Sequence, residues 1–152
     1  MDGCEKLVLT HGELRFTAWT RGDGPCVLLL HGFPDLPQTW EGLMPALAEA
    51  GYKAVAVTNR GYETSSISPA QDYQLTTLAS DVFAWLEALG EESVHLIGHD
   101  WGAAIASAAA AKKPALFRSL CMVSVPHSGR FAEFATKSLK QLWMSRYIML
   151  FQ

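Results

Sequence analysis

Short apolar runs alternate along this chain with longer stretches of helical period, and the two patterns predict different elements. The short runs are rich in β-branched residues and predict strands at residues 5–10, 13–20, 26–30, 53–58, 93–98 and 119–125. The first two strands are expected to form a hairpin that turns at His11-Gly12. The longer stretches predict helices at residues 38–50, 76–89 and 101–113. This alternation favours an α/β fold with a mostly parallel sheet.

The middle helix illustrates how the pattern assigns faces. Its apolar positions fall on one side of the helix, at Leu75, Leu78, Ala79, Val82, Phe83, Leu86 and Leu89. That side is expected to pack on the sheet, whereas Asp81 and Glu87 are expected on the solvated face. The runs at 26–30 and 119–125 are almost continuously apolar, as in strands that are covered on both faces.

After residue 127 the pattern becomes less regular and richer in aromatic residues. It predicts two further helices broken near residue 140, and the chain ends on the apolar run YIMLFQ at residues 147–152 with no stop signal. An uncovered apolar end is typical of a fragment. We therefore expect part of the fold to be absent from this chain and the strand at 119–125 to be an open edge.

Composition excludes some functions without defining one. The chain has 152 residues, of which 49% are hydrophobic and 18% are charged, which predicts one globular unit with a core. Its net charge is −3 and its basic residues do not cluster, so no nucleic-acid partner is expected. The N-terminus does not resemble a signal peptide, and the small-residue run at 103–111 is too short for a membrane span.

The cysteines carry no recognisable site. Cys4, Cys26 and Cys121 are an odd number at wide, irregular spacing, which matches neither a disulfide framework nor a C-x-x-C metal site. We expect reduced core thiols in a cytoplasmic protein, and no metal.

The strongest chemical signal is HLIGHDWGAAIA at residues 95–106. A strand, Gly98, Asp100, Gly102 and a helix follow one another in the spacing of a nucleophile elbow, in which the central residue occupies a strained turn. Glycine is required on either side because a side chain would collide with the neighbouring strand or helix. The helix N-terminus below Asp100 favours an anion. Asp100 is therefore either a nucleophile or simply the N-cap of the helix.

A second motif, HGFPDLPQTW at residues 31–40, directly follows the strand at 26–30. This loop and the elbow both leave the carboxyl ends of neighbouring parallel strands, where ligand crevices form. The backbone N–H groups of Phe33 and Trp101 are therefore expected to converge on one oxygen as an oxyanion hole. Asp35 either caps the helix near residue 38 or leans toward the nucleophile.

Together these residues resemble an α/β-hydrolase-fold epoxide hydrolase, the branch shared with haloalkane dehalogenases. The matching segments are His31-Gly32-Phe33-Pro34-Asp35 with Trp40, NRGYETSS at 59–66, GHDWGAA at 98–104, and SVPH at 124–127 leading into SRYIMLFQ at 145–152. The resemblance implies the α/β-hydrolase fold, a three-layer sandwich with a mostly parallel sheet, here incomplete. Residues 1–127 would form the N-terminal part of the core and residues 128–152 the start of a helical cap.

The resemblance also implies site residues and a substrate. Asp100 would be the nucleophile, and Tyr147, in a Tyr-x-x-x-x-Gln segment ending at Gln152, a possible proton donor. The pocket for a small apolar epoxide would include His31, Gly32, Pro34, Asp35 and Trp101, and no cofactor is expected. Aspartate suits this reaction better than serine, because serine would be left as an ether whereas aspartate forms an ester that water can hydrolyse.

Alternatives remain within and outside this branch. Trp101 could donate its indole N–H to a halide, as in dehalogenases, although Phe33 replaces the asparagine common there and Pro126-His127-Ser128 offers no carboxylate. Fluoroacetate-type dehalogenases usually carry arginine in place of Trp101. A non-catalytic α/β-hydrolase fragment that acts as a binding module is the reading outside enzymes.

The reaction also needs a histidine base and an acid to orient it. In this family both lie beyond the cap, and none of the five histidines of this chain is expected to act as the base. The chain alone is therefore expected to be inactive in turnover. Arg60, Tyr62 and Glu63 are expected in a surface loop with no assigned role.

Overall fold

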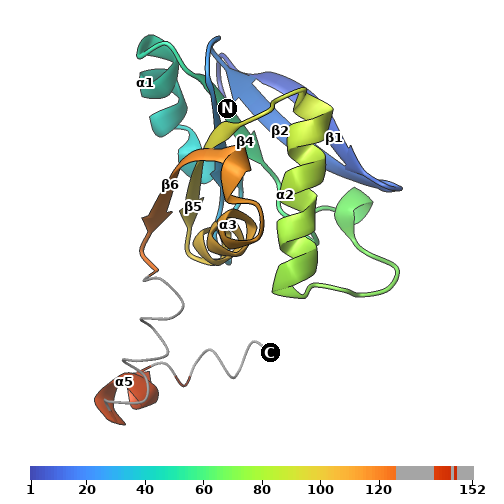
Figure 1. Cartoon of the computed structure of the whole chain (residues 1–152), viewed down its shortest axis with the longest axis vertical. Coiled ribbons are helices and arrows are strands. Elements are labelled where there is room, and N and C mark those ends of the chain that lie inside the picture. Colours follow the sequence, from blue (N-terminus) through green and yellow to red (C-terminus); the bar gives the residue numbers. More distant parts are fainter. Residues whose placement is uncertain (126–138, 145, 147–152) are drawn as a thin grey trace.

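The computed structural model describes residues 1–125, 139–144 and 146. Within residues 1–125, six strands form one sheet in the order β1-β2-β4-β3-β5-β6 (Figure 1). The strands are β1 (Glu5–His11), β2 (Leu14–Arg21), β3 (Cys26–Leu30), β4 (Lys53–Val57), β5 (Val94–His99) and β6 (Phe117–Val123). β1 and β2 pair antiparallel, as do β2 and β4, whereas β4, β3, β5 and β6 run parallel.

The helices are α1 (Leu43–Glu49), α2 (Leu75–Leu89), α3 (Trp101–Lys112) and α5 (Leu139–Met144), with short 3-10 turns η1 (Pro37–Trp40), η2 (Thr64–Ser66) and η3 (Pro114–Leu116). The strands and α2 and α3 lie within two residues of their predicted bounds. The helix predicted at 38–50 is wrong as one unit, because it is divided into η1 and α1. Pro45 explains the division: it lacks an N–H and fits only the first turn of a helix, so the helix restarts at Leu43.

Only residues 139–144 and 146 of the C-terminal region are described, so most of the prediction for that region is not tested. α5 begins at Leu139, and residues 126–138 before it lie outside the described residues, so the helix break predicted near residue 140 stays a prediction. The cap predicted at 128–152 otherwise lies largely outside the described residues.

Helices cover both faces of the sheet, and each face has its own core (Figure 1). On one face, α2 and α3 pack on Leu28, Leu30, Val55 and Leu96, all fully buried. On the other face, Met44 of α1 and Trp40 of η1 pack on the alternate residues of β3 and β4. All five residues of β3 are buried, as expected for a strand covered on both faces. This is the three-layer α/β arrangement that the sequence predicts.

β6 differs from β3, although the sequence predicts both strands to be covered on both faces. It lies at the edge of the sheet, and Leu120 and Val123 are 37% and 38% exposed. The expectation that β6 is covered on both faces is therefore wrong for this chain, while the expected apolar edge is present. Cys121 of β6 is exposed too, so the expectation of core thiols holds for Cys26 but not for this cysteine.

Asp81 corrects the face assignment of α2. It was expected on the solvated face but is only 1% exposed. Arg60 reaches it from the loop after β4, with Nε 2.8 Å from Asp81 Oδ2 and Nη2 2.5 Å from Oδ1. His11 Nδ1, at the end of β1, lies 2.6 Å from the same Oδ1. The helix therefore buries a charged residue with its partners instead of exposing it.

Within the part of the chain that the structure describes, no helix is both long and apolar enough to cross a membrane.

Candidate active site

The elbow between β5 and α3 brings backbone against backbone. Asp100 has φ 51° and ψ −119°, a conformation that L-residues rarely adopt. A Cβ on Gly98 would lie 2.3 Å from the carbonyl oxygen of Gly102, and a Cβ on Gly102 would lie 2.2 Å from the carbonyl oxygen of Leu30 in β3. Both glycines are therefore required for the close contact of strand and helix, as the sequence motif indicates.

The Asp100 side chain does not cap α3. It makes no capping hydrogen bond, and its Oδ1 instead accepts a hydrogen bond of 2.9 Å from the backbone N–H of Phe33. Its own N–H donates to the carbonyl of Val123 at the end of β6 at 3.1 Å. The carboxylate therefore points toward the loop after β3 rather than back onto its own helix.

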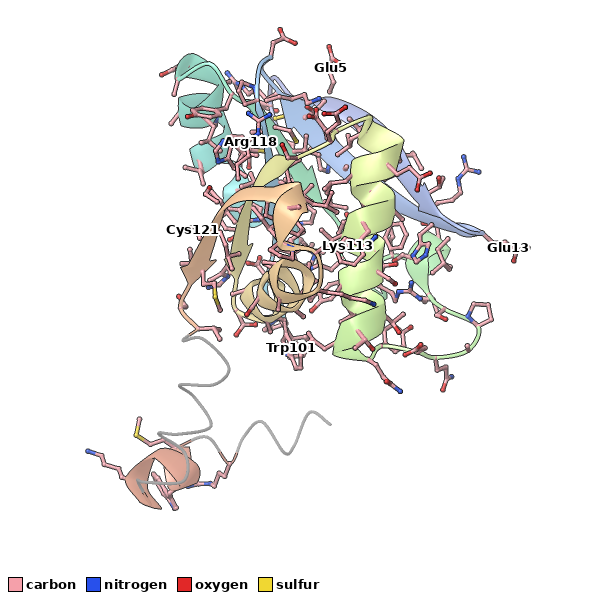
Figure 2. All side chains as sticks on the ribbon, in the orientation of Figure 1. Glu5, Glu13, Trp101, Lys113, Arg118 and Cys121 are labelled. Carbon is pink, nitrogen blue, oxygen red and sulfur yellow. The ribbon has the colours of Figure 1, made fainter. Side chains whose placement is uncertain are left out.

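The two backbone N–H groups expected in the oxyanion hole, those of Phe33 and Trp101, lie in different surroundings. Phe33 N–H already contacts Asp100, and Gly32 permits this approach because a Cβ there would lie 2.7 Å from Asp100 Cβ. Trp101 is the first residue of α3, where backbone N–H groups have no partner within the helix. Its indole side chain is 47% exposed and projects from the start of α3 (Figure 2).

His31 is fully buried within the described residues, and its place in the substrate pocket stays a prediction. The backbone N–H of Asn59 donates to His31 Nε2 at 3.0 Å, and His31 Nδ1 lies 2.9 Å from the carbonyl oxygen of Gly32. Asn59 Nδ2 also donates to the His31 carbonyl at 2.8 Å. Burial lowers the pKa of His31 below its ordinary value, which favours the neutral imidazole at pH 7.

Tyr62 belongs to the site, although the sequence interpretation gave it no role. Its ring meets His31 edge to face, with centroids 4.6 Å apart. Burial raises the pKa of Tyr62, and the charges of Asp100 and Asp35 raise it further. Tyr62 follows β4, the parallel neighbour of β3, and this topology is the signal by which it could have been found.

Asp35 lies near the elbow that carries Asp100 and does not cap the helix that follows it. Its Oδ1 accepts the N–H of Leu36 at 2.8 Å, but η1 has no side-chain cap. Its Oδ2 lies 3.9 Å from Nδ1 of His99, which is buried and makes no hydrogen bond to any described residue. Of the two readings of Asp35, the structure therefore favours the one that faces the elbow. The adjoining Pro34 is exposed and its peptide bond with Phe33 is cis.

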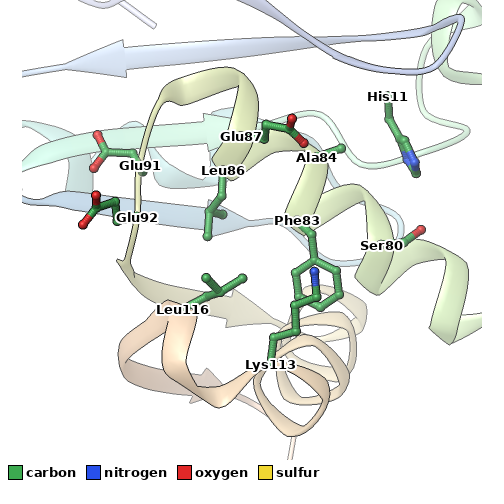
Figure 3. A pocket seen from close by; sticks show the side chains of 10 residues that line it. All are labelled: His11, Ser80, Phe83, Ala84, Leu86, Glu87, Glu91, Glu92, Lys113 and Leu116. Carbon is green, nitrogen blue, oxygen red and sulfur yellow. The ribbon is translucent and has the colours of Figure 1, made fainter.

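Two hollows are found in the described residues, and no residue of the elbow lines either of them. The larger, about 480 Å³, lies between α2 and the connection from α3 to β6, where Lys113 extends over the ring of Phe83 at 4.4 Å (Figure 3). The smaller, about 240 Å³, lies between β2 and the loops after β3 and β4, and Tyr62 forms part of its wall. Among residues 1–125, 139–144 and 146, no group of three or more potential metal ligands gathers.

Several predicted site residues lie outside the described residues. These are the proton-donor candidate Tyr147 with Gln152, and the segment Pro126-His127-Ser128.

The elbow, the adjoining loop and the layered sheet together define a family. The sequence profile described as alpha/beta hydrolase fold matches residues 25–151, and the chain belongs to that family. Within it, the AB hydrolase superfamily protein YfhM of Bacillus subtilis is 35% identical over 156 aligned residues, which cover 100% of this chain and 54% of that protein.

The similar proteins also include epoxide hydrolases. Epoxide hydrolase B of Mycobacterium tuberculosis is 43% identical over 108 residues, which cover 70% of this chain and 30% of that protein. A solved epoxide hydrolase from an endophytic Streptomyces superposes with a TM-score of 0.79 at 36% identity, covering 84% of this chain and 39% of that one. The chain thus spans about half the length of YfhM and less of the epoxide hydrolases.

Proposed function

We propose that this chain carries the nucleophile half of an epoxide hydrolase active site. One observation supports this most: the Asp100 carboxylate sits in a strained turn and accepts the Phe33 N–H at 2.9 Å, while it leaves its own helix uncapped. A structural N-cap would do the opposite. The similarity to epoxide hydrolases at 36% and 43% identity supports the same reaction.

In the first step, Asp100 opens the epoxide. Oδ1 is held by Phe33 N–H, so Oδ2 is the oxygen that attacks an epoxide carbon. A C–O bond forms with Asp100 as the ring C–O bond breaks, and the released oxygen takes a proton from an acid, for which we propose Tyr147. The product is a hydroxyalkyl ester of Asp100.

In the second step, water attacks the ester at Asp100 Cγ. Negative charge develops on Oδ1, and the N–H groups of Phe33 and Trp101 would stabilise it there. Collapse of the tetrahedral intermediate breaks the bond between Cγ and Oδ2, so the diol leaves with Oδ2 and the carboxylate is restored with the oxygen of the attacking water. A base must take the proton from water.

We propose that none of the four described histidines supplies that base; the fifth, His127, lies outside the described residues. His31 is buried, and its Nε2 accepts the N–H of Asn59. His11 pairs with Asp81, and His95 Nδ1 lies 2.8 Å from the hydroxyl of Ser119. His99 lies beside Asp35, at 3.9 Å, on the strand that precedes Asp100. The chain would therefore stop at the ester.

A dehalogenase-like reaction is the second candidate, supported by the exposed Trp101 indole next to Asp100. The same carboxylate would then displace a halide that the indole N–H binds. Asp35 and Asp100 both place negative charge at this edge, and both raise the pKa of Tyr62. This charge disfavours haloacids, so neutral haloalkanes are the more favourable halogenated substrates.

The free thiols bear on the location of the protein. Cys4, Cys26 and Cys121 are unpaired, and burial raises the pKa of Cys26 to about 12. The unpaired cysteines support a reducing compartment, and we propose the cytoplasm.

The test incubates the 152-residue chain with a terminal aryl epoxide and, separately, with the matching primary alkyl bromide. The proposal expects one adduct with the full mass of the epoxide, localised to Asp100 by peptide mass spectrometry and removed by hydroxylamine, as an ester is. Faster reaction with the bromide, with one bromide released per chain, would favour the dehalogenase.

Two controls make the adduct specific. Asp100→Ala must lose it, and urea-unfolded chain must not form it. Alkylation of the exposed Cys121 gives a thioether that hydroxylamine does not cleave, so the two products are distinguishable. Absence of any Asp100 ester from the folded chain would favour a non-catalytic binding module, and repeated diol release would contradict the predicted lack of a base.

A further inference from the structure

The two ring nitrogens of His31 have different partners, which assigns its proton. Nε2 receives the backbone N–H of Asn59 at 3.0 Å, so it must be the unprotonated acceptor. Nδ1 then carries the hydrogen and donates it to the carbonyl oxygen of Gly32 at 2.9 Å. The lowered pKa of the buried ring agrees with this neutral tautomer.

The carbonyl of Gly32 and the N–H of Phe33 belong to one peptide group. In a planar trans peptide, the C=O and N–H bonds point in opposite directions. The Gly32 carbonyl points to His31 Nδ1, and the Phe33 N–H points to Asp100 Oδ1 at 2.9 Å. A single peptide plane thus connects the buried histidine to the carboxylate of the elbow.

We infer that His31 is a positioning residue, whose Nδ1–H fixes the Gly32–Phe33 peptide so that the Phe33 N–H faces Asp100 Oδ1. Its role in catalysis rests on the function proposed above. If this peptide turned over, the Gly32 carbonyl oxygen would face the Asp100 carboxylate instead, and the site would have repulsion where it needs a donor.

The surroundings of His31 keep it in this role. Asn59 holds both the ring and the backbone of His31, and the Tyr62 ring closes over its edge. Arg60 lies between these two residues and is tied to Asp81 of α2 by two hydrogen bonds. His31 is 0% exposed, so water is excluded from replacing its Nδ1–H on the Gly32 carbonyl.

Two substitutions separate the ring nitrogens. The asparagine amide nitrogen stands as many bonds from the backbone as Nδ1 does, whereas the glutamine amide group corresponds to Nε2. His31→Asn therefore keeps a donor for the Gly32 carbonyl and loses the contact with Asn59. His31→Gln loses that donor and keeps a partner for Asn59.

His95 provides the matched control. It lies in β5, four residues before His99 and about 13 Å away along the strand, and bonds Ser119. His95→Asn and His95→Gln apply the same chemical changes to a histidine distant from Asp100. Both are expected to leave the Phe33 amide and the chemistry at Asp100 unchanged.

The first readout needs no substrate. In NMR spectra of the full chain, wild-type His31 is expected to carry its proton on Nδ1. His31→Gln is expected to shift the Phe33 amide proton upfield and increase its exchange, and His31→Asn to preserve both. A proton on Nε2 in the wild-type chain overturns the inference even if the variants fail to fold.

The second readout is the alkaline decay of the Asp100 ester, because the oxyanion donors act in that step. Loss of a whole oxyanion donor slows catalysis by about 100-fold to 1,000-fold. Misorientation in His31→Gln is expected to slow decay at least about 10-fold, with His31→Asn within about threefold of wild type. A purely structural histidine would slow decay only in proportion to lost stability, which denaturant unfolding measures.

The outcomes of the two readouts are independent. If no chain forms an ester, the proposed function fails while the NMR readout still decides the inference. If esters form and His31→Gln decays as fast as wild type with an unchanged Phe33 amide, the inference is overturned and the proposed function stands.

Discussion

The elbow at residues 98–102 and the segment at 59–66 border the same site, but they are held in different ways. The elbow is held by backbone contacts: hypothetical Cβ atoms on Gly98 and Gly102 would stand 2.3 and 2.2 Å from carbonyl oxygens. The 59–66 segment is held by side chains, with Asn59 on His31, Arg60 on Asp81 and the Ser66 hydroxyl on the carbonyl of Glu63 at 3.0 Å.

This difference determines what each segment tolerates. Close backbone contact has no substitute, because any side chain must move the strand or the helix. Polar side-chain contacts can be removed one at a time, at costs that depend on whether a charge is left buried without its partner. We therefore expect side chains added at Gly98 or Gly102 of the elbow to disrupt the fold, and substitutions in the 59–66 segment to have graded effects.

Gly102→Ala is expected to have the largest effect. Its methyl group would lie 2.2 Å from the Leu30 carbonyl oxygen and 2.6 Å from that of His31, so α3 and β3 would have to separate. We expect a loss of about 3 kcal/mol or more in the free energy of unfolding, measured by urea denaturation. Gly42→Ala is the control, because nothing lies within 4 Å of its added methyl group, and equal losses in both variants would contradict this account.

Asp81→Asn is expected to follow, at about 3 kcal/mol, because it leaves the guanidinium of Arg60 buried without the carboxylate that pairs with it. Arg60 and Asp81 are 8% and 1% exposed, so water cannot solvate the guanidinium that has lost its partner. The measurement is again urea denaturation.

The double substitution Arg60→Leu with Asp81→Leu tests the cause. Replacing a buried ion pair by apolar residues is often close to neutral, so most of the lost stability should return. A double variant as unstable as Asp81→Asn would mean that the packing of α2, not the unpaired charge, accounts for the loss.

These two segments also show what the sequence could and could not predict. Strands, helices and the elbow were predictable because each depends on local pattern: apolar period, glycine spacing and order along the chain. Asp81 was assigned to the wrong face because its partners, Arg60 and His11, are 21 and 70 residues away. Trp85, buried one helical turn later, is the local signal that this side of α2 faces inward.

Prediction of the roles of individual site residues was limited in the same way, by contacts with residues far away in the sequence. Asp100 and Phe33 could be paired from two motifs on neighbouring strands, because the carboxyl ends of parallel strands share one edge. The burial of His31 could not be predicted, since it depends on how Asn59 and Tyr62 fold over it. Sequence patterns identified the motif residues but could not separate those that face a ligand from those that hold the loop.

Asp100→Gly is expected to increase stability. At φ 51° an aspartate is strained, and glycine adopts this conformation freely, so the free energy of unfolding should rise by about 1 kcal/mol while the Asp100 ester is lost. Gln71→Gly, at φ 49°, is the matched control, which should gain stability without any change at Asp100. A loss of stability in Asp100→Gly with a gain in Gln71→Gly would mean that the bond to Phe33 outweighs the strain.

The smallest expected effect is on the titration of Tyr62, which reports the charge of the elbow from the other segment. Burial is the main cause of its raised pKa, with Asp100 next, so Asp100→Asn should lower the pKa while leaving it above its ordinary value of 10.0. Because the folded chain holds this proton more tightly, stability should fall as pH rises above 10.0, and fall less steeply in Asp100→Asn. NMR of ¹³C-labelled tyrosine measures the pKa, with Tyr52 as the internal reference. An unchanged Tyr62 pKa would mean that the two segments are electrostatically independent.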